Sequence, residues 1–118
     1  MKGKNEILEL SLKFAIRIVH LYQYLCNEKK EYVLSKQLLK SGTSVGANVR
    51  EAIYAQSRND FIAKMSISLK EISETEYWLE LLHRTNILDQ RQYQSMNEDC
   101  TRITRILISI VKTSKNNR

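Results

Sequence analysis

The stretch QLLKSGTSVGANVRE, residues 37–51, decides how this chain folds. It contains two of the three glycines, Gly42 and Gly46, in a chain that has no proline. Because serine, glycine and threonine are poor helix formers, one interpretation of residues 41–46 is a loop. The other is a helix with a face of small side chains, because apolar residues continue through the stretch at three- and four-residue spacing. These apolar residues are Leu34, Leu38, Val45, Val49 and Ala52.

Energetics favour the helix. Two glycines cost about 2 kcal/mol relative to alanine, and burial of three or four aliphatic side chains at about 1.5–3 kcal/mol each offsets that cost. Gly42 and Gly46 are four residues apart and lie on one side of such a helix, where a neighbouring backbone comes close. A phosphate-binding loop needs Lys-Ser or Lys-Thr after the second glycine, and Ala47 and Asn48 stand there instead.

Length and composition indicate a single all-α domain over residues 1–118. No apolar run approaches the roughly 20 residues that span a bilayer, and no signal-peptide pattern follows Met1. We therefore expect a cytoplasmic protein without membrane association. Cys26 and Cys100 are too few for a disulfide framework and have no Cys/His cluster beside them, so we expect ordinary thiols.

Hydrophobic periodicity predicts four helices, at about residues 5–26, 32–55, 58–84 and 90–112, and a mobile tail at 113–118. Ser57 or Asn59 is the candidate N-cap of the third helix, and Asp89 that of the fourth. Four helices of similar length with short connectors predict an antiparallel, up-down-up-down four-helix bundle.

The first helix carries two adjacent apolar stripes, although one bundle core accounts for a single stripe. The second stripe consists of Leu8, Leu12, Ala15, Val19 and Tyr22. The fourth helix also has a broad apolar face, which Ile106, Ile108 and Val111 widen. Leaving both surfaces in water would expose a larger apolar patch than soluble monomers show. We therefore expect a homo-oligomer.

No complete catalytic or metal-binding set is visible. A di-metal bundle site uses two Glu-x-x-His pairs, and this chain has one, Glu80 and His83. We therefore expect no metal, no cofactor and no enzymatic activity. Glu76 interrupts the apolar stripe of the third helix, which indicates a buried, partnered glutamate or, as the less favoured alternative, a catalytic carboxylate. Its candidate partners by residue type are Asn48, Arg50, Arg17 and Lys40.

The formal net charge is +6, and no acidic residue follows Asp99. A basic end suits nucleic acid or another acidic surface, and the alternative interpretation is a solvated helix face. Contacts of this kind would be to phosphates and largely blind to base sequence. The candidate nucleic-acid-binding residues are Arg102, Arg105, Lys112 and Lys115, with Lys36, Lys40 and Arg50 as additions from the second helix.

Four segments resemble the bacterial four-helix bundle protein family, also called the 23S ribosomal RNA intervening-sequence proteins. They are LLKSGTSVGANVRE at 38–51, DFIAK at 60–64, LKE at 69–71 and ETEYWL at 74–79. The resemblance covers nearly the whole chain and implies an antiparallel four-helix bundle assembled as a ring-like homopentamer. The family is similar to the accessory protein of diversity-generating retroelements, a basic pentamer that associates with nucleic acid and a reverse transcriptase.

The resemblance implies structural roles for named residues and no catalytic motif. It implies close packing at Gly42, Gly46 and Ala47. It implies buried polar positions at Asn48, Glu51, Glu71 and Glu76. The expected function is a non-catalytic, basic, oligomeric scaffold that binds the backbone of RNA or DNA. The alternative is a protein–protein assembly module, such as a partner of a reverse transcriptase, with no direct nucleic-acid contact.

Overall fold

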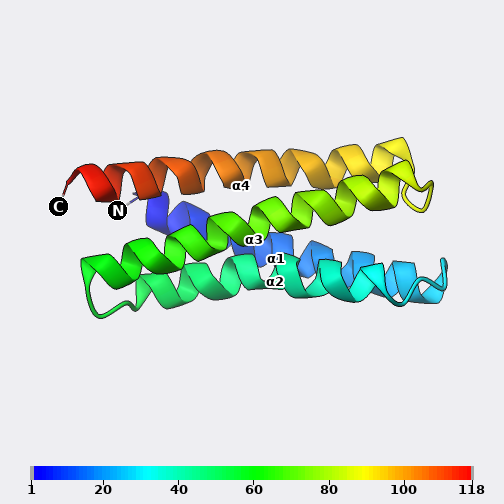
Figure 1. The fold of residues 1–118 in the computed structure, drawn as a ribbon, viewed down its shortest axis with the longest axis horizontal. Helices are drawn as coiled ribbons and strands as arrows, with labels where there is room; N and C mark the ends of the chain where they lie inside the picture. Colours follow the sequence, from blue (N-terminus) through cyan, green and yellow to red (C-terminus); the bar gives the residue numbers. More distant parts are fainter. Residues whose placement is uncertain (1, 118) are drawn as a thin grey trace.

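The computed structural model describes residues 2–117, which form four α-helices and no strand. The helices are α1 (Lys2–Asn27), α2 (Leu34–Ile53), α3 (Arg58–Arg84) and α4 (Gln90–Asn116). The predicted all-α architecture of four helices is confirmed. The molecule measures 47 × 21 × 19 Å, and the chain reverses direction at each short connector, so the start of α1 and the end of α4 lie at the same end (Figure 1).

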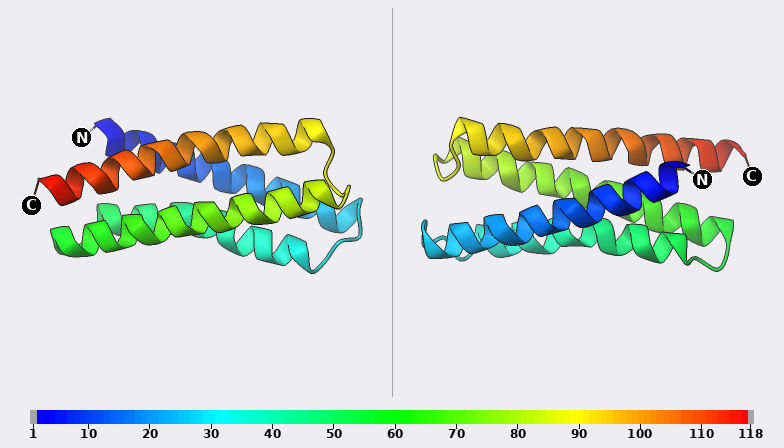
Figure 2. Two further views of the ribbon diagram at one scale, coloured as in Figure 1. Left: turned by 45° about the horizontal axis from the view of Figure 1, so that its top comes forward. Right: turned by 180° about the vertical axis from the view of Figure 1, so that it is seen from behind.

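The four helices occupy the corners of a square in chain order. α2 packs against α1 and α3, and α4 packs against α3 and α1. Across the two diagonals, α1–α3 and α2–α4, no Cα atoms of the described chain come within 8 Å. The side of the bundle formed by α1 and α2 is therefore opposite the side formed by α3 and α4. In the right-hand view of Figure 2, which is seen from behind, α1 lies in front and α3 passes behind it.

The glycine stretch is helical throughout, as predicted, because α2 runs without a break from Leu34 to Ile53. A Cβ atom built on Gly42 would lie 2.7 Å from Cγ1 of Ile18. One built on Gly46 would lie 3.2 Å from the backbone oxygen of Ser11. Both glycines therefore lie where α2 approaches α1 closely.

The core contains one apolar stripe from each helix. On α1 the buried stripe is the one adjacent to the second stripe defined above, and its residues Ile7, Phe14, Ile18 and Leu25 are at most 1% exposed. The second stripe points out of the bundle, and Leu12 is 45% exposed. One small bundle therefore buries only one of the two stripes, as the periodicity argument required.

Small polar side chains, which the sequence analysis did not single out, lie inside the seam between α2 and α3. The Thr75 hydroxyl donates to Oγ of Ser41 at 2.9 Å, and the Ser68 hydroxyl donates to the backbone oxygen of Val45 at 2.8 Å. All three hydroxyl-bearing residues are fully buried. Because each has a partner, the seam carries no desolvation cost for an unpaired group.

The helix termini are capped mostly as expected. The Ser57 side chain accepts a hydrogen bond from the backbone N–H of Asp60, and Asp89 forms a reciprocal capping box with Gln92. The start of α2 is different. Its first turn is capped by the carboxylate of Glu31, which accepts from the backbone N–H groups of Leu34 and Ser35 at 2.9 and 2.8 Å. α2 therefore begins two residues later than predicted.

The predicted end of the fourth helix at residue 112 is wrong, because residues 113–116 of the expected tail continue α4 as a regular helix. Arg118 lies outside the described residues. The last turn is held because it lies beside the start of α3, where the guanidinium of Arg58 donates to the backbone oxygen of Asn117. The sequence pattern missed this extension because a polar turn gains order only from its neighbours in space.

Over the described residues, none of the helices is long and apolar enough to cross a membrane.

Candidate nucleic-acid interface

The outward side of α4 carries the four basic residues that the sequence analysis assigned to this helix, and all are exposed. They are Arg102, Arg105, Lys112 and Lys115. Arg105 and Lys112 are seven residues apart, so they lie on one face of the helix, about two turns or roughly 10.5 Å from each other. The structure therefore brings these cations onto one exposed surface, which we call the α4 basic face.

The residues of the α4 basic face differ in whether their side chains already have an ion-pair partner. Arg102 forms an ion pair with Glu6 of α1, with 3.6 Å between the guanidinium nitrogen and the carboxylate oxygen. Within residues 2–117, the side chains of Arg105, Lys112 and Lys115 form no hydrogen bond or ion pair. These three side chains can approach a phosphate without giving up an existing contact, whereas Arg102 would exchange one partner for another.

The position of these cations on the helix also has a structural benefit. Lys112 and Lys115 lie near the C-terminal end of α4, where the helix dipole is negative and a positive side chain is stabilising by about 0.3–1 kcal/mol. Helix stability alone therefore explains why positive residues stand at positions 112 and 115, which agrees with the interpretation of α4 as a solvated helix face. It does not account for Arg105, which lies about three turns before the end of the helix.

The structure does not join the basic residues of α2 to the α4 basic face. Lys36, Lys40 and Arg50 are exposed on α2, but α2 and α4 are diagonal in the bundle. The expectation that they extend one patch is therefore wrong within a single chain. Sequence alone placed both sets on helix surfaces, and only the order of helices around the square separates them.

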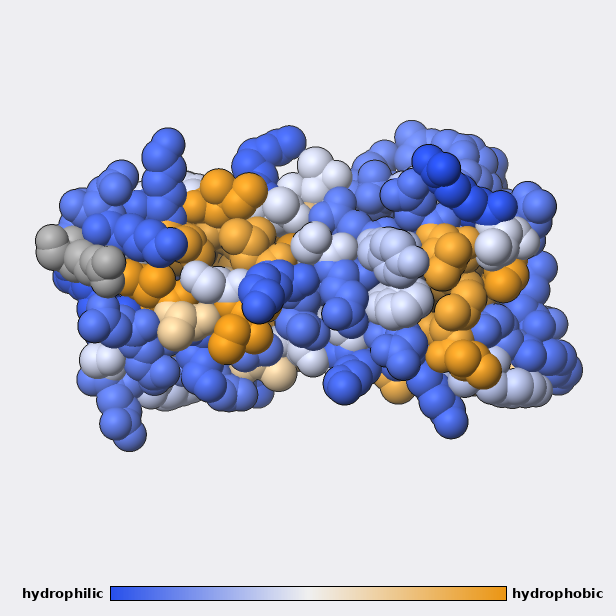
Figure 3. Space-filling view, in the orientation of Figure 1, coloured by the Kyte–Doolittle hydropathy of each residue, from blue (hydrophilic) through white to orange (hydrophobic). Residues whose placement is uncertain are grey.

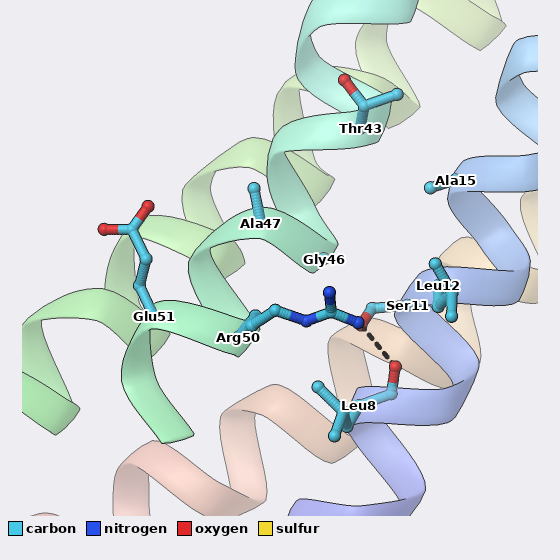
Figure 4. Close-up of a pocket in the computed structure, with 9 residues that line it drawn as sticks. All are labelled: Leu8, Ser11, Leu12, Ala15, Thr43, Gly46, Ala47, Arg50 and Glu51. Carbon is cyan, nitrogen blue, oxygen red and sulfur yellow. Dashed lines mark hydrogen bonds between the residues drawn. The ribbon is translucent and has the colours of Figure 1, made fainter. Parts of the chain in front are cut away.

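A second surface feature is an apolar groove of about 410 Å³ between α1 and α2. We call it the α1–α2 groove. It is lined by Leu8, Ser11, Leu12, Ala15, Thr43, Gly46, Ala47, Arg50 and Glu51. Figure 4 shows the α1 side chains directed into the space and the Arg50 side chain reaching from α2 toward α1. The signal for this groove was already in the sequence, as the second stripe of α1 opposite the small residues of α2.

Ala47 and Glu51 do not have the roles that the resemblance implied. Ala47 is exposed at the edge of the groove and does not pack closely against another helix. Glu51 is exposed and pairs with Lys64 of α3 at 3.0 Å. Both residues stand on the outward half of α2, because the buried half is already occupied by the apolar stripe and Gly42.

The other three expected polar positions are half-buried. The Asn48 side-chain amide donates to the backbone oxygen of Ser44. The backbone oxygen of Glu71 accepts from the hydroxyl of Thr75. Glu76 has a partner that was not among its candidates, because the Thr104 hydroxyl of α4 donates to its carboxylate at 3.5 Å. Glu76 faces α4 across the α3–α4 seam, which excludes the proposed partners on α1 and α2.

Burial raises the pKa of the Glu76 carboxyl, and the hydrogen bond from Thr104 acts in the opposite direction with a smaller effect. Burial likewise raises the pKa of the nearby Cys100 thiol, and the charges of Glu76 and Asp99 raise it further. A thiol in this environment stays protonated and is a poor nucleophile. Cys26, by contrast, is half-buried with its Sγ 3.8 Å from Oγ of Ser35, and both cysteines are free thiols.

The Glu80–His83 spacing does not assemble a metal site. Glu80 pairs with Arg84 at 2.9 Å. The His83 ring stacks on Tyr93 at 4.6 Å between centroids, and its Nδ1 lies 3.1 Å from the backbone oxygen of Leu88. Across the part of the chain that the structure describes, no group of three or more His, Cys, Asp or Glu residues is placed to hold a metal ion.

Comparison with known proteins agrees with this fold. The model of the family described as "23S rRNA-intervening sequence protein" matches residues 3–109. A 1.70 Å crystal structure of a protein of unknown function, from the S23 ribosomal protein family of Bacteroides thetaiotaomicron, is similar with a TM-score of 0.92 and 59% sequence identity. That match covers 93% of this chain and 98% of the other. No curated protein matches.

Proposed function

The chain belongs to the 23S rRNA-intervening sequence protein family, and from this premise we propose that it is a non-catalytic, basic, oligomeric scaffold that binds the backbone of RNA or DNA. The binding surface in this proposal is the α4 basic face. Its contacts are to phosphate groups, so binding is insensitive to base sequence and falls steeply with salt.

The observation that carries the proposal is the set of cations on α4 that have no counter-charge among the described residues. Arg105, Lys112 and Lys115 are exposed and unpaired within residues 2–117, and no acidic residue follows Asp99 in the sequence. Unpaired cations on one helix face are the pattern that phosphate binding requires. The one aromatic residue of α4, Tyr93, is stacked on His83, so the α4 basic face offers no free ring for stacking single-stranded bases, which favours duplex or structured RNA.

In this proposal the protein acts as a homo-oligomer. The family resemblance implies five copies, which raises the formal charge of +6 per chain to about +30 and repeats the α4 basic face around the assembly. Repetition matters because several weak binding sites in one assembly give a higher overall affinity than a single site, even though each site makes the same contacts.

A second candidate function is a protein–protein assembly module, such as a partner of a reverse transcriptase. The α1–α2 groove favours it, because an exposed apolar groove is a recognised mode of helix docking between proteins. In this alternative the α4 basic face is a solvated surface with no direct nucleic-acid contact.

Fluorescence anisotropy with labelled duplex DNA and hairpin RNA tests the proposal. At about 50 mM salt, where electrostatic binding is strong, the wild type should bind both, and the log–log salt slope should be clearly negative. The double variant Arg105→Glu with Lys112→Glu should bind at least tenfold more weakly for every sequence tried, with a shallower slope.

The matched control is Lys29→Glu with Lys30→Glu, which makes the same charge change in the exposed connector at the opposite end of the bundle. It should weaken binding much less than the α4 variant. Equal losses would mean that net charge alone governs binding and that the α4 basic face is not the site. Absence of any binding by the wild type at about 50 mM salt would favour the assembly module.

A further inference from the structure

A polar pocket of about 380 Å³ lies at the end of the bundle that holds the start of α1, the connector between α2 and α3, and the end of α4 (Figure 1). We call it the end pocket. At this end of the molecule, apolar surface is bordered by hydrophilic side chains (Figure 3). None of the described residues that line the pocket is acidic, and its polar lining consists of Lys4, Ser57, Arg58, Thr113, Ser114 and Asn117.

Lys4 is a half-buried cation without a counter-charge. Three lysine and arginine residues are half-buried among the side chains that the structure describes. The other two, Arg17 and Lys64, each form an ion pair with a carboxylate. Lys4 forms no ion pair with a described residue, and its ammonium nitrogen lies 4.6 Å from the centre of the Phe61 ring, which also lines the pocket. A cation that is partly removed from water and faces only an aromatic ring is well placed to bind an anion.

Arg58 and three hydroxyl groups supply further hydrogen-bond donors. The Arg58 guanidinium donates to the backbone oxygen of Asn117 and has no ion pair within residues 2–117. Because a guanidinium has several N–H groups, most of them remain free for another acceptor. The hydroxyls of Thr113 and Ser114 have no hydrogen-bond partner in the described part of the chain. The Ser57 hydroxyl caps α3 by accepting from a backbone N–H, and it keeps its own proton to donate.

The carboxylates nearest in sequence to the pocket residues have partners elsewhere. Glu6 forms an ion pair with Arg102. Glu51 raises the pKa of Lys64 through a hydrogen bond and its charge, and the charge of Asp60 adds to this effect, so Asp60 acts on Lys64. The end pocket therefore combines two cations with several donors and has no acidic residue among its described lining. Such a lining suits an anion with several acceptor oxygens.

A phosphate monoester matches this lining better than other biological anions. It carries close to two negative charges at neutral pH and has three acceptor oxygens. A carboxylate or an internal phosphodiester carries a single charge, which leaves one of the two cations unbalanced. The pocket volume of about 380 Å³ lies within the range of roughly 300–1,000 Å³ that is usual for small-ligand sites, so a phosphate group and the sugar beside it can enter.

The end pocket continues the α4 basic face. Lys112 and Lys115 stand on the same last turns of α4 as the pocket residues Thr113 and Ser114. Arg105 lies nine residues before Ser114, which is about 13.5 Å along the helix. That distance equals about four nucleotide steps of a duplex strand, at roughly 3.4 Å each. A strand whose backbone lies along the α4 basic face therefore reaches the pocket within a few nucleotides.

We propose that the end pocket binds the terminal phosphate monoester of a nucleic-acid strand whose backbone lies on the α4 basic face. The inference deepens the proposed function and rests on it, because it makes strand ends the preferred place of binding for the scaffold. Lys4 and Arg58 balance the charge of the terminal phosphate, and the hydroxyls of the pocket donate to its oxygens. Arg105 and Lys112 contact the internal phosphates that follow.

Fluorescence anisotropy with hairpin RNA of one sequence tests the pocket. The hairpin carries an internal label and a phosphate at its 5′ end, at its 3′ end or at neither. At about 50 mM salt, where electrostatic binding is strong, the wild type should bind one of the phosphate-ended forms about tenfold more tightly than the hydroxyl-ended form, because charge-assisted hydrogen bonds are the stronger class. Equal affinity for all three forms would overturn the inference.

Two double variants separate the pocket from net charge. Lys4→Gln with Arg58→Gln should bring the ratio of the hydroxyl-ended to the phosphate-ended dissociation constant close to one, and Lys4→Gln alone should lower it. The matched control is Lys36→Gln with Lys40→Gln, which removes the same charge from exposed positions on α2. It should keep the wild-type ratio, and circular dichroism should show all variants folded. An equal fall of the ratio in the control would make net charge the cause and overturn the pocket.

Competition at constant ionic strength decides whether the bound phosphate belongs to a strand end or to a free small molecule. A nucleoside 5′-monophosphate lacks the contacts to α4, so only millimolar concentrations should remove the preference for the phosphate-ended hairpin, because linked sites reinforce each other. Removal of the preference at micromolar concentrations would assign the pocket to a free phosphate monoester and overturn the strand-end assignment.

Failure of the proposed function gives a different pattern. If no hairpin binds at about 50 mM salt, the scaffold and this inference fall together. If the hydroxyl-ended and phosphate-ended forms bind equally, the scaffold stands and only the end pocket falls. The Arg105→Glu, Lys112→Glu variant should weaken binding of all three forms by a similar factor and leave their ratio at the wild-type value.

Discussion

Replacing Gly42 with alanine should destabilise the protein, although alanine is the better helix former. The new methyl group would lie 2.7, 2.8 and 2.9 Å from the Cγ1, Cδ1 and Cγ2 atoms of Ile18, whereas carbon atoms pack at about 3.5–4.0 Å. Rotation of the Ile18 side chain gives little relief, because the residue is branched at Cβ and strongly restricted in a helix. It is also fully buried.

The magnitude is the difference of two terms. Alanine gains about 1 kcal/mol over glycine in a helix interior, and overpacking a close contact costs about 1–3 kcal/mol. The net effect of Gly42→Ala is a destabilisation of about 1 kcal/mol, within a range of roughly 0–2 kcal/mol.

The same substitution at the other two glycines provides a comparison within the protein. A Cβ on Gly46 would meet the Ser11 backbone at 3.2 Å, which a small shift relieves, so Gly46→Ala should be close to neutral. A Cβ on Gly3 would lie 3.9 Å from Ile110, an ordinary contact, so Gly3→Ala should stabilise by about 0.5 kcal/mol. Urea unfolding should be followed by circular dichroism at one protein concentration, because assembly shifts apparent stability. The free energy of unfolding should be lowest for Gly42→Ala, intermediate for Gly46→Ala and highest for Gly3→Ala.

A double-mutant cycle isolates the contact. Ile18→Ala removes all three overlapping atoms and opens a cavity, which the methyl group introduced by Gly42→Ala partly fills. The two substitutions should therefore couple favourably, by about 1 kcal/mol or more. The reasoning would be refuted by Gly42→Ala stabilising the protein as much as Gly3→Ala, or by a cycle with no coupling.

Three further predictions concern polar groups. Burial raises the pKa of Glu76 above its ordinary value of 4.5, so the free energy of unfolding of the wild type should fall as pH rises from 4.5 through that raised pKa. Glu76→Gln should remove this fall. Equal pH dependence of the two proteins in urea unfolding would contradict the assignment. For Glu31, burial raises the pKa but the backbone hydrogen bonds from Leu34, Ser35 and Val33 outweigh it, so the pKa is lowered. Its stabilisation should be complete above pH 4.5 and lost as pH falls through the lowered value, and Glu31→Gln should show a smaller acid-induced loss in the same urea assay. Asp89→Ala removes a capping box and should cost about 1 kcal/mol; an unchanged urea midpoint would argue that the cap is redundant.

Local chemistry in the sequence was sufficient to predict the four helices and the two polar caps. Apolar spacing carries the helical period through residues 37–51 despite two glycines, because burial of the stripe outweighs their intrinsic cost. Ser57 and Asp89 were identifiable because an N-cap needs only a short polar side chain within three residues of the first free N–H. The Glu31 cap was missed because its longer side chain reaches forward to the backbone N–H groups of Leu34 and Ser35 from a position two residues before the usual cap.

What only the tertiary structure decided is which surfaces meet and which remain exposed. The sequence contained two apolar stripes on α1 and basic residues on two helices, but periodicity does not tell which stripe faces the core or which helices are diagonal. The structure buries Phe14 and Ile18, leaves Leu12 in the groove, and puts Arg50 and Arg105 at opposite corners. It also pairs Glu76 with Thr104 and continues α4 through residue 116. These outcomes depend on contacts between residues far apart in the chain, because burial and ion pairing are properties of neighbours in space.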